Sequence, residues 1–118
     1  MVHIYGIPNC DTVKKAITWL KKHRIAFVFH DFKQETIPDQ QLKAWCEALG
    51  WETVLNKKST TWRALDAATQ AGIKNNSNAI RLMKANMSII KRPVLEKNGD
   101  IQVGFDEATY SNIFKTSV

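Results

Sequence analysis

Two apolar runs near the amino terminus, separated by a segment with helical spacing, restrict the fold more than any other feature. Residues 2–5 and 25–32 are rich in β-branched and aromatic side chains, which is typical of buried strands. Between them, apolar residues recur at the period of an amphipathic helix, at Val13, Ala16, Ile17 and Leu20. Strands joined by such a crossover pair in parallel, with a right-handed connection. The sequence therefore predicts a βαβ unit.

The middle of the chain has helical patterns and no convincing strand. Pro38 and Asp39 open a helix that is expected to end at Gly50, with the proline in its tolerated first turn. The hydroxyl groups of Ser59, Thr60 and Thr61 are candidate N-caps for a helix that starts near Trp62. A further helix is expected over 78–86, and 51–58 is expected to be a connector.

Strand patterns return near the carboxy terminus. Apolar pairs and triplets at 89–90, 93–95 and 101–103 surround Asn98-Gly99, a strong signal for a two-residue hairpin. Asp106 is placed to cap a closing helix. The element order predicts one α/β domain over 1–118, a thioredoxin-like mixed four-stranded sheet with an all-helical insertion at about 37–87.

Cys10 lies in the turn between the first predicted strand and its helix. The first N–H groups of a helix lack intrahelical partners and carry the positive end of the helix dipole, which favours a thiolate. The neighbours Pro8, Asn9, Asp11 and Thr12 are polar or turn-forming, which disfavours the alternative of a small residue buried among apolar atoms. We expect Cys10 to be a catalytic nucleophile, with Asn9 and Thr12 shaping the turn and donating to a bound anion.

Cys46 is the only other cysteine, and no second thiol stands at the spacing of a redox pair from Cys10. A reaction cycle at Cys10 therefore needs an external thiol, such as glutathione or a partner's cysteine, to resolve its disulfide. Cys46 shares an apolar helical stripe with Leu42, Trp45 and Leu49, so we interpret it as a core residue.

Arg92 and Pro93 precede the strand of the predicted hairpin. A proline restricts the residue before it to extended backbone, and the bond between them is compatible with a cis peptide. In the expected fold Pro93 faces the Cys10 turn and presents its backbone to a bound thiol or peptide. Arg92 then offers a planar fork of donors to an anion. A surface arginine at a strand edge is the alternative.

The chain carries 17 Lys and Arg against 11 Asp and Glu, a formal net charge of +6. This balance favours anionic partners, but the lysines are scattered in pairs, and a solvated surface is the better explanation for them. His3, His23 and His30 lack ligand spacing, so neither a metal nor a bound cofactor is predicted.

Neither a membrane span nor a secretory signal is visible in the sequence. No apolar run approaches the roughly 20 residues that cross a bilayer, and the first residues lead directly into a strand. We therefore expect a cytoplasmic protein, and we expect it to be monomeric.

Three blocks of the sequence together resemble the family of arsenate reductases (ArsC), Spx and YffB, most closely the YffB branch. They are YGIPNCDTVKKA at 5–16, KKSTTWR at 57–63 and IIKRPVL at 89–95. The similarity covers nearly the whole chain, and the blocks stand in the family's order. The resemblance implies a thioredoxin-like fold with a helical insertion, in agreement with the pattern of elements.

The resemblance also implies roles for two residues. In the family's arsenate reductases a cysteine attacks arsenate, and glutathione with glutaredoxin completes the reduction. Cys10 matches that cysteine, and Arg92 matches an arginine that contacts the oxyanion. Two further arginines do not carry over, since Asn56 and Gly104 stand where they are expected. Charge-assisted contacts contribute roughly 1.5–3 kcal/mol each, so these losses disfavour arsenate as substrate.

We expect a monothiol oxidoreductase that depends on glutathione, acts on glutathionylated or disulfide substrates and has glutaredoxin as a further partner. The first alternative is an arsenate reductase, in which Lys57, Lys58 or Arg63 replaces part of the missing positive charge. The second is a non-enzymatic regulator that binds RNA polymerase, as Spx members do. The chain lacks the cysteine pair with which those members sense oxidation.

Overall fold

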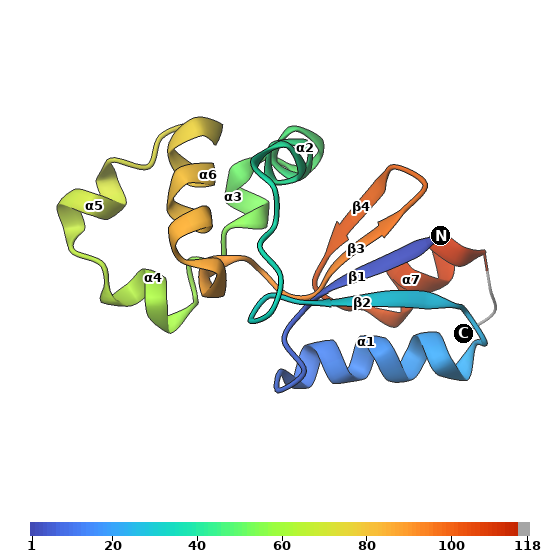
Figure 1. The fold of residues 1–118 in the computed structure, drawn as a ribbon. Helices are drawn as coiled ribbons and strands as arrows, with labels where there is room; N and C mark the ends of the chain where they lie inside the picture. The colour runs from blue at the N-terminus through green and yellow to red at the C-terminus, as the bar shows by residue number, and fades with distance from the viewer. Residues whose placement is uncertain (116–118) are drawn as a thin grey trace. The chain divides into compact units, whose positions relative to one another are not determined.

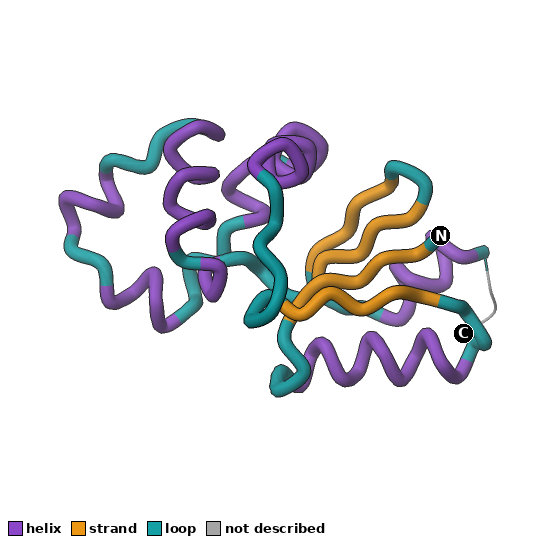
Figure 2. The backbone as a smooth tube through the Cα atoms, in the orientation of Figure 1, coloured by secondary structure: helices purple, strands orange, loops and turns teal. Residues whose placement is uncertain are grey.

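The computed structural model describes residues 1–115 and divides the chain into two compact units. The first unit comprises residues 1–33 and the segment that follows residue 91, and the second comprises residues 34–91. Every named strand of the described chain belongs to the first unit. The second unit is helical, with one isolated bridge between Leu55 and Ile90 (Figure 2).

The first unit is a mixed four-stranded sheet with two helices (Figure 1). The sheet has the order β2-β1-β3-β4, with β1 parallel to β2, β1 antiparallel to β3 and β3 antiparallel to β4. This topology confirms the thioredoxin-like fold and the parallel βαβ unit. The elements are β1 (Val2–Gly6), α1 (Asp11–Lys22), β2 (Phe27–Asp31), β3 (Val94–Lys97), β4 (Asp100–Val103) and α7 (Glu107–Phe114).

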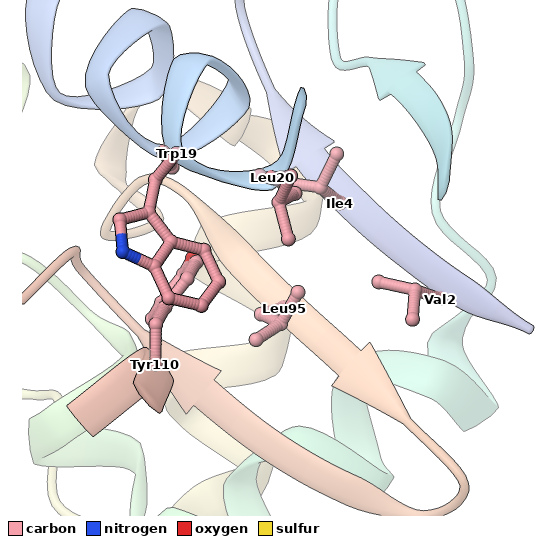
Figure 3. Close-up of a cluster of buried hydrophobic side chains, with 7 residues drawn as sticks. Val2, Ile4, Trp19, Leu20, Leu95 and Tyr110 are labelled. Atoms are coloured by element: carbon pink, nitrogen blue, oxygen red, sulfur yellow. The ribbon is translucent and has the colours of Figure 1, made fainter. Parts of the chain in front are cut away.

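One face of the sheet packs against both helices of this unit. Side chains alternate along β1, so Val2 and Ile4 enter the core while His3 and Tyr5 lie on the opposite face. Trp19 of α1 meets Tyr110 of α7 edge-on, with ring centroids 5.5 Å apart (Figure 3). The cluster consists of Val2, Ile4, Ala16, Trp19, Leu20, Leu95 and Tyr110. Burial of each large apolar side chain contributes about 1.5–3 kcal/mol.

The predicted hairpin and the closing helix are both confirmed. Asn98 and Gly99 adopt positive φ angles of 51° and 90°, the backbone of a tight two-residue hairpin. An Asp106 carboxylate oxygen accepts a 3.0 Å hydrogen bond from the Thr109 N–H at the start of α7. The Thr109 hydroxyl donates to the same carboxylate at 2.8 Å, and this bond together with the backbone one lowers the pKa of Asp106 below its ordinary value.

The second unit contains five α-helices and one 3-10 helix. They are α2 (Asp39–Leu49), α3 (Trp51–Val54), α4 (Thr60–Ala64), α5 (Ala67–Ala71), α6 (Asn76–Ala85) and η1 (Met87–Ile89). Of the three candidate caps at residues 59–61, Ser59 is the N-cap, since its hydroxyl oxygen accepts a hydrogen bond from the Trp62 N–H. No helix in the described part of the chain is both long and apolar enough to traverse a bilayer.

Two expectations for this unit were wrong. The stretch after Gly50 begins with the helical turn α3 instead of a connector, because Gly50 adopts a φ of 85° and Leu55 then donates to the carbonyl of Trp51. The pair Ile89-Ile90 is not a strand. Both side chains are buried through a 3-10 turn, and the flanking backbone bonds go to Asn56 and Val54.

Candidate active site

Cys10 occupies the N-cap position of α1, the residue at which the chain changes from loop to helix. Its backbone is extended, with φ −112° and ψ 126°, and its carbonyl accepts the first helical hydrogen bond from the Lys14 N–H at 2.9 Å. The Cys10 side chain makes no capping hydrogen bond, so it leaves the N–H groups of the first turn to a bound anion. The side chain is half-buried.

The close packing of α1 on the end of β1 fixes this helix start. A Cβ atom added to Gly6 would lie 2.7 Å from Cγ2 of Val13, inside van der Waals contact. Val13 is completely buried. The absence of a side chain at Gly6 therefore lets the first turn of α1, with Cys10 before it, approach the strand.

Asn9 and Thr12 flank the cysteine as predicted. Asn9 is exposed in the loop that connects β1 to α1, and Thr12 is half-buried in the first turn of α1. Both side chains thus lie within two residues of Cys10. Their proposed contacts with an anion stay predictions.

The strand register brings Arg92 and Pro93 to the same end of the sheet as the Cys10 loop. Tyr5, near the end of β1, pairs with Val94, the first residue of β3. The Arg92–Pro93 bond is cis, Pro93 is buried and Arg92 is half-buried. The Pro93 carbonyl accepts a 2.9 Å hydrogen bond from the Gly104 N–H, so this oxygen serves the fold.

The two positions that lack the family's arginines have local structural roles. Gly104 has a φ of 77°, which a glycine adopts far more readily than an arginine. In the second unit, the Asn56 side-chain oxygen accepts from the Lys58 N–H at 3.0 Å and closes a turn. The Lys57 ammonium group lies over the rings of Trp51 and Trp62, 5.3 and 5.9 Å from their centroids.

Cys46 is the buried core residue that its helical stripe predicts. It lies on α2 of the second unit with an exposed fraction of 1%. Burial raises the pKa of its thiol from 9.0 to about 11, because the apolar surroundings disfavour the charged form. The thiol is therefore neutral at physiological pH.

A cluster of polar side chains on the sheet face opposite the core escaped sequence reasoning. Nδ1 of His3 and Nε2 of His30 are 2.8 Å apart, and the His30 ring stacks on Tyr5 at 4.4 Å. The Tyr5 hydroxyl donates to Glu96 at 3.0 Å. Tyr5 and His30 are paired across the parallel strands β1 and β2, and this pairing could have indicated the cluster. Recognising it requires the register of the two strands, which the sequence alone does not give. Among residues 1–115 no group of three or more His, Cys, Asp or Glu side chains is arranged to hold a metal.

Known proteins are similar to this one in fold and in sequence over almost the full chain. The structure of a YFFB protein superposes with a TM-score of 0.90 at 46% identity, covering 95% of this chain and 97% of that one. An arsenate reductase (ArsC) related protein from Brucella melitensis gives a TM-score of 0.75 at 44% identity, with 97% and 94% covered.

A curated relative and a family model extend the comparison. The global transcriptional regulator Spx of Streptococcus mutans is 29% identical over 91% of this chain and 78% of its own length. The model of the ArsC family matches residues 5–113. The protein, with its mixed sheet and its cysteine at the start of α1, therefore belongs to the ArsC family and is of the YffB type.

Proposed function

We propose that the protein is a glutathione-dependent thiol oxidoreductase with Cys10 as its nucleophile. The observation that carries this proposal is the position of Cys10, half-buried at a helix start that its side chain does not cap, against the sealed position of Cys46. A half-buried thiol beside free backbone N–H groups is accessible to a disulfide and is next to donors that stabilise developing negative charge.

The proposed cycle needs one protein thiol and two molecules of glutathione. The Cys10 thiolate attacks the glutathione sulfur of a mixed disulfide, and a new S–S bond forms as the old one breaks. The substrate leaves as a thiolate and takes a proton from water. A second glutathione thiolate then attacks the Cys10–glutathione disulfide, which releases glutathione disulfide and restores the Cys10 thiolate.

Arg92 and Pro93 support this cycle in the proposal. The cis Arg92–Pro93 bond stands at the end of the sheet where the Cys10 loop begins. A guanidinium group there would bind a carboxylate of glutathione, and Asn9 and Thr12 would line the turn. Glycine at position 104, where the resemblance leads us to expect an arginine, leaves fewer cations in the first unit for a multiply charged oxyanion, which favours glutathione over arsenate.

Mass spectrometry after mild oxidation tests the proposal. Incubation of the native protein with glutathione disulfide is expected to add one glutathione to Cys10 and none to Cys46. Subsequent addition of reduced glutathione should release it as glutathione disulfide. An adduct on Cys46, or the absence of any adduct on the folded protein, would contradict the proposed function.

A regulatory function is the second candidate, and the similarity to the regulator Spx over 91% of the chain favours it. In this case the protein would bind RNA polymerase, and Cys10 would be dispensable. Affinity capture with wild-type protein and with Cys10→Ser separates the two functions. Equal recovery of polymerase by both proteins would support the regulator, and failure of both to recover it would leave the oxidoreductase.

A further inference from the structure

A basic groove runs along α1 in the first unit, beginning one turn after Cys10. It has a volume of about 370 Å³ and is lined by Lys14, Lys15, Thr18, Trp19, Lys22, Phe105 and Glu107. Its cations outnumber its carboxylates by three to one. Trp19 is 4% exposed, and Phe105 is half-buried. The groove therefore combines an aromatic lining with a positively charged rim.

The groove lies along α1, the helix that begins directly after Cys10. Lys14, Thr18 and Lys22 follow Cys10 at intervals of four residues, and residues four apart lie on one side of a helix. At about 1.5 Å per residue, Lys14 lies roughly 6 Å and Lys22 roughly 18 Å along the axis from Cys10. A chain that reacts at Cys10 can thus extend along the groove.

The lysines of this groove are not engaged elsewhere in the described structure. Other lysines have internal partners: Lys84 pairs with Asp39 at 3.0 Å, and Lys97 donates to the Ile113 carbonyl at 2.8 Å. Lys14, Lys15 and Lys22 are exposed, and none of them pairs with a carboxylate of residues 1–115. Their positive charge is available to a ligand.

We propose that this groove binds an acidic polypeptide segment of the disulfide substrate. The inference rests on the proposed function and specifies its substrate class. The groove spans roughly 12 Å between Lys14 and Lys22, which an extended chain covers in about four residues. The acidic side chains should therefore stand about two to six positions from the reacting cysteine. Charge complementarity at such a surface raises the rate of encounter and selects the partner.

Two neighbouring lysines make a matched pair of variants. Lys22 lines the groove, whereas Lys21 is also exposed on the same helix but does not line it. Both are farther from Cys10 than the Debye length of about 8 Å at physiological salt. Lys22→Glu and Lys21→Glu thus change the charge equally without acting directly on the thiol. Equal rates of Cys10 alkylation by neutral iodoacetamide verify that the thiol is unchanged.

The experiment compares two peptides, each presented as a mixed disulfide with glutathione. One carries Asp and Glu near its cysteine, and the other carries Asn and Gln at the same positions. With wild-type protein we expect kcat/KM for release of the acidic peptide to be about tenfold higher, with the preference falling as salt is added. Lys22→Glu should remove most of this preference, and Lys21→Glu should retain it.

Several outcomes overturn the inference. One is an equal kcat/KM for the two peptides with wild-type protein, and another is an equal effect of the two lysine variants. A third is that a single-stranded oligonucleotide displaces the bound acidic peptide at a lower concentration than unlabelled acidic peptide does.

A binding measurement separates the groove from the chemistry. Wild-type protein, Lys22→Glu and Lys21→Glu are each titrated into a labelled acidic peptide that has serine in place of its cysteine. Fluorescence polarisation reports the binding. The serine peptide can bind, with Lys22→Glu alone weakening its binding, while no thiol is released from the mixed disulfides. This result would support the groove as a peptide site and contradict the proposed function. If thiol is released from both peptides equally and binding is insensitive to Lys22→Glu, the function stands and the groove fails.

Discussion

The two cysteines of this chain occupy opposite environments, one in each unit. Cys10 stands half-buried at the start of α1, beside backbone N–H groups that its side chain does not cap. Cys46 is in α2 with 1% of its surface exposed, and burial raises the pKa of its thiol to about 11. The same side chain is thus placed for chemistry in the first unit and serves as a small apolar group in the second.

The position of each cysteine relative to its helix accounts for part of this difference. At the N-cap the sulfur lies outside the helical hydrogen-bond pattern, near the positive end of the dipole. Cys46 lies inside α2, three residues before its end, where its thiol is almost completely buried. Four measurements can break or sharpen the comparison.

The largest expected effect is the loss of glutathione exchange in Cys10→Ser. A hydroxyl group is a far weaker nucleophile than a thiolate at neutral pH, so turnover should fall to the uncatalysed rate. Cys46→Ser is the matched control and should retain turnover at temperatures where it is folded. Steady-state assays on both variants measure this, and equal losses would show that Cys46 is the resolving thiol.

Alkylation at pH 8 should label Cys10 far faster than Cys46. With a pKa of about 11, only about one Cys46 thiol in a thousand is ionised at that pH, and its burial further limits access. Peptide mass spectrometry after brief iodoacetamide treatment should find label on Cys10 alone. In urea both residues should react, and equal labelling of the native protein would refute the comparison.

Alkaline pH should destabilise the protein through Cys46. Burial raises the pKa of the Cys46 thiol in the folded state from 9.0 to about 11. The neutral thiol therefore contributes its full stabilisation below pH 9, and this contribution is lost as pH rises from 9 to about 11. The free energy of unfolding should fall by about 2–3 kcal/mol across this window.

Urea titrations at pH 8, 9, 10 and 11 measure this change. Cys46→Ala should show a smaller decrease between pH 9 and 11 than wild type does. Burial also raises the pKa of Tyr110, so Tyr110→Phe is the control for the first unit. The same pH profile for wild type and Cys46→Ala would contradict the assignment.

The smallest expected effect concerns the packing that positions Cys10. Gly6→Ala places a Cβ atom 2.7 Å from Cγ2 of Val13 and should reduce stability by about 1–3 kcal/mol. It should also slow alkylation of Cys10, because the start of α1 must shift. A second substitution, Val13→Ala, removes the clashing methyl groups. If the double variant does not recover the alkylation rate of Val13→Ala alone, Gly6 does not position the site.

Local patterns predicted most of the sheet and its turns. The βαβ unit follows from apolar spacing, the hairpin from Asn98-Gly99 and the start of α7 from Asp106, because each depends on residues close in sequence. The helical turn α3 and the 3-10 turn at Ile89 were not predicted. Their apolar residues are buried by contacts from distant segments, and short apolar runs do not distinguish a strand from a turn.

The candidate site was predictable in its residues but not in its geometry. Cys10 and Pro93 were recognisable from their neighbours and from the family resemblance. The pairing of Tyr5 with Val94, which brings Pro93 to the Cys10 end of the sheet, is a long-range register. The same limit explains why the His3–His30 contact was missed, since it joins residues on two strands.

The sheet register also has a consequence for engineering. The segment 34–91 leaves the first unit after β2 and rejoins it before β3, and these two strand ends flank the end of β1. Two strand spacings of about 4.8 Å separate the two attachment points, a gap that a linker of about four residues bridges. The helical segment can therefore be treated as an exchangeable cassette, and transplants between relatives would reveal which half of the chain dictates substrate choice.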